Sequence, residues 1–108
     1  MSAGRRETPL AIDARHPAFE GHFPGQPILP GVVLLGEVMA VLESTERRPP
    51  EQWTLASAKF LSPAKPGEDL VMRHERLSTG AVRWEISAAG RVVATGLAAP
   101  SAPGPDAT

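Results

Sequence analysis

The chain has 108 residues, of which 42% are hydrophobic and 21% are charged, as is typical of one folded globular domain. Its 11 basic and 12 acidic residues nearly cancel, and no basic run is interleaved with aromatic residues, so nothing indicates a nucleic-acid partner. The absence of cysteine excludes disulfides, thiolate chemistry and cysteine-based zinc sites. Three scattered histidines make a poor ligand set, and we expect no metal.

The two ends of the chain differ in composition from its middle. Residues 1–7 are expected to fray, and the Pro, Ala, Gly and Ser of residues 100–108 predict a disordered tail, which leaves one domain over residues 8–99. The first ten residues lack the apolar core of a secretory signal, and the apolar stretch near residues 32–42 is too short to span a bilayer. We therefore expect a cytoplasmic protein that does not enter the membrane.

The first half of the chain predicts one strand, one irregular loop and one helix. "TPLAIDA" (8–14) alternates as a strand does, and a segment rich in glycine and proline follows from His16 to Gly31. Proline suits the first turn of a helix, so Pro30 and Gly31 open a helix through "VVLLGEVMAVLESTERR", which "RRPP" (47–50) ends. Its apolar residues point nearly all round, which predicts a largely buried helix.

The second half of the chain changes to the two-residue period of strands. Strands are predicted near 54–61, 69–77, 81–89 and 91–99, with short turns between the last three and "PAKPGED" (63–69) after the first. Consecutive strands separated by short turns should pair as a meander. One early helix and a following antiparallel sheet predict an α+β fold, most economically a central helix wrapped by a curved sheet.

The segment "GHFPGQPILPG" (21–31) places a histidine and a helix start in unusually rigid surroundings. A neutral imidazole near pH 7 is a suitable general base, which makes His22 the leading catalytic candidate. The free N–H groups at a helix start can stabilise negative charge on a carbonyl oxygen, and Gly31 lets such an oxygen approach the backbone. Phe23 and the prolines would fix the histidine relative to that point.

"HPAFEGHFPGQPILPGVVLL" and "KFLSPAKPGEDL" resemble the signature of the 3-hydroxyacyl-carrier-protein dehydratases of the FabA/FabZ type, including the dehydratase-like proteins of aryl-polyene clusters. The resemblance covers roughly residues 8–98 and implies the hotdog fold, with no cofactor and with an active site at a subunit interface. It implies that His22 takes the α-proton of a 3-hydroxyacyl thioester. It also implies that an acid on the partner's helix protonates the departing hydroxyl, while the acyl chain lies in an apolar tunnel.

One position departs from the family. Gly36 stands where the family has its acid, and Glu37 follows one residue later, about 100° further round a regular helix. Three interpretations remain open. Glu37 reaches the site through a local π-type widening of the helix; or it acts elsewhere and water replaces the acid poorly; or catalysis is lost and the fold serves binding or assembly.

These observations favour dehydration of 3-hydroxyacyl thioesters to trans-2-enoyl thioesters, in fatty-acid, polyketide or aryl-polyene biosynthesis. The alternatives are a non-catalytic subunit that binds acyl carrier or pairs with a dehydratase, and an acyl thioesterase. Expected partners are acyl carrier protein or a coenzyme A thioester, and a second hotdog subunit in a homodimer, heterodimer or higher oligomer. His16 is expected to bond local backbone and His74 to be solvated. The candidate catalytic residues are His22 and Glu37, and the candidate substrate contacts are Phe23, Leu29, Gly31, Val32, Val33 and Leu34.

Overall fold

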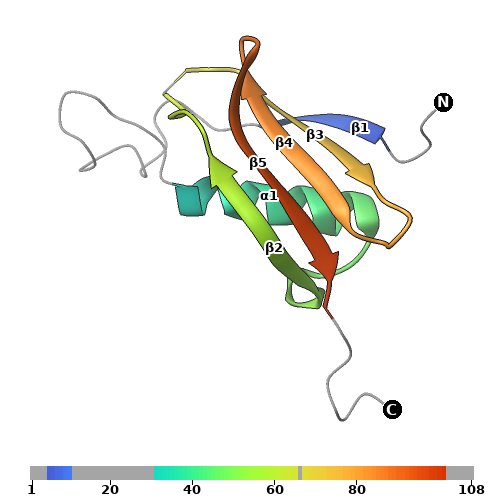
Figure 1. Ribbon diagram of the computed structural model, residues 1–108. Coiled ribbons are helices and arrows are strands. Elements are labelled where there is room, and N and C mark those ends of the chain that lie inside the picture. The colour runs from blue at the N-terminus through green and yellow to red at the C-terminus, as the bar shows by residue number, and fades with distance from the viewer. Residues whose placement is uncertain (1–4, 11–30, 66, 102–108) are drawn as a thin grey trace, which may run out of the picture.

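A computed structural model describes residues 5–10, 31–65 and 67–101 of the chain. The elements, in chain order, are β1 (Arg5–Leu10), α1 (Gly31–Glu46), the 3₁₀ turn η2 (Pro50–Gln52), β2 (Trp53–Phe60), β3 (Leu70–Arg76), β4 (Val82–Ala88) and β5 (Arg91–Pro100). All five strands form one antiparallel sheet, and α1 lies along one face of it (Figure 1). The predicted α+β class, with one helix and one antiparallel sheet, is confirmed.

The strand order is β1-β3-β4-β5-β2, so the meander predicted for strands joined by short turns is confirmed for β3, β4 and β5. The strand β2 precedes β3 in the chain but pairs with β5, with Phe60 opposite Ala94. The connection over residues 61–69 carries the chain from one side of the sheet to the other. A connection of this length allows a crossover, whereas the short turns after β3 and β4 force neighbouring strands to pair.

The first strand begins earlier than its alternation suggests. It starts at Arg5, inside the segment expected to fray, because its residues pair with β3 in a register that runs from Arg5 opposite Glu75 to Leu10 opposite Leu70. Residues 11–14 of the predicted strand lie outside the described residues, as does most of the predicted tail. The domain limits at residues 8 and 99 stay a prediction.

The helix α1 packs on the sheet through one face only. Leu34, Val38 and Leu42, spaced four residues apart, are its buried residues, whereas Val32 is 75% exposed. The predicted largely buried helix is thus fully buried in the single chain only along this face, with Val33, Leu35, Met39 and Val41 partly buried beside it. Within the described part of the chain, no helix is long and apolar enough to cross a membrane.

The core lies between α1 and the inner face of the sheet. Residues two apart on one strand share a face, as the buried residues of β3 and β4 do, and every strand contributes at least one residue to this layer. The largest fully buried side chains are Trp84, Leu42, Met72, Ile86, Val38, Val82 and Val93.

Candidate functional site

The predicted site residues divide between described and undescribed parts of the chain. His22, Phe23 and Leu29 lie outside the described residues, so their roles stay predictions. Gly31, Val32, Val33, Leu34 and Glu37 all lie in the first two turns of α1. Leu34 is buried against the sheet, Val33 and Glu37 are half-buried, and Val32 is exposed.

The amino end of α1 is defined by a contact between Gly31 and Phe60. Gly31 is the first residue of the helix, and a Cβ placed on it would lie 2.8 Å from Cζ and 3.0 Å from Cε1 of the Phe60 ring. Any larger residue would have to displace the ring, so this closeness requires glycine at position 31. The last residue of β2 is thus held against the first residue of α1.

The first turn of α1 can stabilise a developing negative charge. The first N–H groups of a helix have no partner within the helix, and the helix dipole adds partial positive charge there. The first turn contains no acidic side chain that would compete for these groups. Phe60 covers the side of Gly31 that faces the sheet, while its ring remains 49% exposed. A carbonyl oxygen bound at this turn would therefore lie beside an apolar ring.

Gly36 faces away from the sheet. An α-helix turns by about 100° per residue, so a residue two positions from the buried Val38 lies on nearly the opposite side. Gly36 is exposed, and a Cβ placed on it would meet nothing within 4 Å. A carboxylate at this position would thus point outward from the single chain.

Glu37 lies on the flank of α1, about 100° from Val38. The helix is α-helical without interruption from Gly31 to Glu46. The interpretation that a local π-type widening turns Glu37 toward the position of the family's acid is therefore wrong. The side chain is half-buried. A role of Glu37 as the acid from the flank of a regular helix stays a prediction, as do the other two interpretations of the Gly36 and Glu37 pair.

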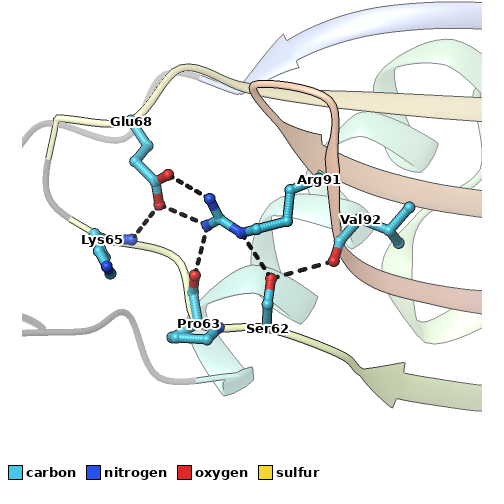
Figure 2. A network of polar contacts seen from close by, with 6 residues as sticks. All are labelled: Ser62, Pro63, Lys65, Glu68, Arg91 and Val92. Carbon is cyan, nitrogen blue, oxygen red and sulfur yellow. Dashed lines mark hydrogen bonds and ion pairs between the residues drawn. The ribbon is translucent and has the colours of Figure 1, made fainter.

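An arginine-centred network fixes the connection after β2 (Figure 2). The Arg91 guanidinium donates to both carboxylate oxygens of Glu68, at 2.9 and 3.0 Å, and to the carbonyl of Pro63 at 2.8 Å. Its Nε donates to Ser62 Oγ at 2.9 Å. The Arg91 hydrogen bond holds the pKa of Glu68 below its usual range, and the same bond raises the pKa of Arg91. The pair is therefore charged at neutral pH.

His74 is buried, contrary to the prediction that it is solvated. Its side chain is 2% exposed, and a hydrogen bond of 3.1 Å joins its Nε2 to Oγ1 of Thr8 on β1. Burial lowers the pKa of His74, with the neighbouring Glu46 acting in the opposite direction. His74 thus ties β1 to β3 as a neutral ring, a structural role that its position two residues after the buried Met72 could have indicated.

The sequence predicts some of the residues around the start of α1 but not others. Phe60 and Glu68 belong to the "KFLSPAKPGEDL" motif, but Arg91 carried no signal because its partners come from a distant stretch of chain. Among the described residues, no three side chains of His, Asp or Glu gather as a metal site would need.

Comparison with known proteins gives concordant results. The family model described as ApeI-like, ApeI dehydratase, matches residues 2–97. A relative from Thiobacillus denitrificans named 3-hydroxyacyl-[acyl-carrier-protein] dehydratase FabZ is 36% identical over 69% of this chain, and the match spans 59% of that relative's length. A relative of the same name from Geotalea uraniireducens is 31% identical over 94% of this chain and 76% of its own length.

A solved structure confirms the fold. The dehydratase heterocomplex ApeI:P from Xenorhabdus doucetiae superimposes with a TM-score of 0.72 over 92% of this chain and 88% of the other, at 23% identity. The arrangement of one helix along a five-stranded antiparallel sheet is therefore the hotdog fold that the family resemblance implies.

Proposed function

The chain belongs to the ApeI-like dehydratase family, and on this premise we propose that it removes water from 3-hydroxyacyl thioesters on acyl carrier protein, giving trans-2-enoyl thioesters. The observation that carries the proposal is the family match, which runs through both the His22 segment and α1. The names of the FabZ relatives support the reaction and the carrier. They do not favour thioester hydrolysis. The products would enter fatty-acid, polyketide or aryl-polyene biosynthesis.

The proposed reaction is an elimination. The imidazole of His22 takes the proton from the carbon next to the thioester carbonyl, and the electron pair forms the new carbon–carbon double bond. The hydroxyl leaves from the next carbon and takes a proton from an acid, so that water departs. The negative charge that develops on the carbonyl oxygen is received by the N–H of Gly31 at the start of α1.

The acyl chain would lie along the apolar residues near this turn. Val32 and Val33 offer apolar surface on the outer side and flank of α1, and Leu34 lies toward the sheet. Phe23 and Leu29 complete the proposed set of contacts. No cofactor is required, because a base, an acid and the helix end suffice for the elimination.

A second hotdog subunit would complete the site. The large exposed apolar side chains of the described residues are Val32 of α1, Phe60 (49% exposed) at the end of β2, and Leu61 (53% exposed), which follows it. The strand β2 is also an edge of the sheet, so its outer backbone groups can pair with another chain. A subunit seated here would cover the apolar side chains and enclose the thioester beside Gly31.

The acid would come either from Glu37 or from the partner subunit. Glu37 is the carboxylate on this chain nearest in sequence to the family's position, but it lies on the flank of a regular helix. The glycine at position 36, where the family has its acid, favours a heterodimer in which this chain supplies His22 and a paralogue supplies the acid. The dehydratase heterocomplex of similar fold supports that second arrangement.

The test is an assay of the purified chain with a 3-hydroxyacyl group on carrier protein, in which the enoyl product is followed by mass spectrometry. His22→Ala should abolish dehydration, and the matched control His16→Ala should retain it. Glu37→Gln separates the two sources of the acid, because it inactivates a homodimer that uses Glu37 and leaves an acid-supplying heterodimer active. Wild-type rates in His22→Ala, or release of free acid in place of enoyl product, would refute the mechanism.

The assembly is measured separately, by light scattering of the chain alone and after co-expression with a paralogue that carries an acid at the Gly36 position. A dimer is expected in one of the two samples. Activity only in the co-expressed sample would assign this chain to the heterodimer. A monomer in both samples would contradict a shared site.

A further inference from the structure

The contact between Phe60 and Gly31 depends on the backbone that follows Phe60. Phe60 ends β2, and the next residue, Leu61, donates its N–H to the carbonyl of Val93 at 2.8 Å. Ser62 donates its N–H to the same carbonyl at 3.3 Å, and its hydroxyl donates to the carbonyl of Val92 at 3.2 Å. Phe60 itself pairs with Ala94 of β5, and the hydrogen bonds of Leu61 and Ser62 extend this attachment of the backbone to β5 by two residues.

Arg91 binds Ser62, the last residue of these hydrogen bonds, through its Nε. The guanidinium group has five N–H donors in a rigid fork, and four of its hydrogen bonds go to Ser62, Pro63 and the two oxygens of Glu68. Glu68 in turn accepts the backbone N–H of Lys65 at 2.7 Å. One side chain thus holds both the start and the end of the connection between β2 and β3 (Figure 2).

The strength of this arrangement lies in its geometry. Arginine pairs with a carboxylate in parallel through two donors, which fixes the relative orientation of the two groups as well as their distance. Lysine would keep the positive charge, but its single ammonium cannot reach Ser62, Pro63 and Glu68 in one plane. The exchange of Arg91 for lysine therefore separates the effect of geometry from that of charge.

We infer that Arg91 and Glu68 are positioning residues of the proposed active site, which hold Phe60 against Gly31 and so fix the surroundings of the amide that receives the thioester carbonyl. The inference rests on the proposed function. Neither residue touches the substrate. They act through Ser62 and Leu61 on the ring, and a ring that leaves Gly31 would admit water to the helix start and weaken its hold on the developing charge.

The position of the ring can be measured without substrate. The chain has three phenylalanines, so labelling with 4-fluorophenylalanine gives three ¹⁹F resonances, and Phe60→Leu identifies that of Phe60. In Arg91→Lys this resonance should move toward its position in the unfolded chain. The matched control is Arg73→Lys, in an exposed arginine–carboxylate pair with Glu7 on the opposite side of the sheet, and it should leave the resonance unchanged.

Kinetics provide the second readout. A displacement of about 1 Å in an active site can cost on the order of a hundredfold in rate, so we expect kcat of Arg91→Lys to fall by about tenfold or more with KM little changed. Glu68→Gln keeps the size of the side chain and one acceptor oxygen, and should show a smaller change of the same kind. It carries the test if Arg91→Lys does not fold.

The outcomes distinguish this inference from the proposed function. A wild-type chain without dehydratase activity, alone and with its paralogue, would refute the function. The ¹⁹F measurement would still show whether Arg91 and Glu68 hold Phe60 against Gly31. An active wild type with an unchanged Phe60 resonance and unchanged kcat in the Arg91 and Glu68 variants would refute the positioning role alone.

Discussion

Gly96 on β5 is the position at which the structure predicts the largest effect of a single methyl group. It lies opposite Trp84 of β4 and Ala58 of β2. A Cβ at this position would lie 2.5 Å from both Cε2 of Trp84 and the carbonyl oxygen of Ser57, and closer still to Cζ2 of the indole. Carbon atoms normally approach to about 3.5–4.0 Å, so in Gly96→Ala the indole or the backbone of β2 must move by about 1 Å or more.

Neither neighbour can yield cheaply. Trp84 is 1% exposed and packs in the core, and the Ser57 carbonyl belongs to the backbone of a paired strand. Overpacking of this kind costs about 1–3 kcal/mol, and we place Gly96→Ala near the upper value. The lower conformational entropy of unfolded alanine offsets about 0.5–1 kcal/mol of that cost. The expected net loss in the free energy of unfolding is about 2 kcal/mol.

The assay is thermal unfolding followed by circular dichroism, with all proteins at one concentration because association also shifts Tm. The entropy of unfolding is about 2.1 cal/mol/K per residue, so for 108 residues the expected loss lowers Tm by about 9 °C. A Gly96→Ala protein that unfolds at the wild-type temperature or above it would refute the packing of Trp84 against β5.

Three further predictions concern α1 and its surroundings. Gly36→Ala should raise stability by up to about 1 kcal/mol in the same assay, because the new methyl meets nothing and alanine is the better helix former; a lower Tm would contradict this. Arg76→Met should cost about 1–3 kcal/mol by urea unfolding, because it leaves the Glu46 carboxylate, 8% exposed and 2.7 Å from its partner, without that partner; Arg73→Met in an exposed pair is the control and should cost less. Burial lowers the pKa of His74, so below about pH 6.5 the unfolded chain binds a proton more readily than the folded chain, and the free energy of unfolding decreases as the pH is lowered. This decrease should be smaller in His74→Gln, and identical pH profiles of the two proteins would refute the assignment.

The helix and the strands were predictable because their signals are local. The proline at position 30 and the "RRPP" segment bracket a helix that the structure ends at Glu46. The alternation of "AVRWEISAA" places Val82, Trp84 and Ile86 on the buried face of β4 as expected. Four strands begin and end within about two residues of their predicted limits, an ordinary boundary error for patterns of this kind.

The pairing of β2 was not predictable from local signals. Consecutive strands are neighbours in most sheets, which favoured β2 beside β3. The crossover instead depends on contacts between the connection at residues 61–69 and β5, above all those of Arg91. These contacts join residues 23–29 positions apart, a distance over which periodicity carries no information. The burial of His74, in contrast, was predictable, because its alternation with Leu70 and Met72 indicates a buried face in spite of the polar imidazole.

The one-sided burial of α1 has a further meaning. The residues of the helix are apolar nearly all round, yet the single chain buries only the face with Leu34, Val38 and Leu42. On the outer side, Gly36 and Ala40 are exposed and small, so another backbone could approach there, and Val32 offers apolar surface beside them. An apolar pattern reflects the burial of each residue in whatever assembly a protein forms, whereas the structure of a single chain shows only the contacts within that chain. The exposed apolar surface on this side of α1 is what the second subunit of the proposed assembly would cover, and Gly36, which leaves open space, lies on the same side.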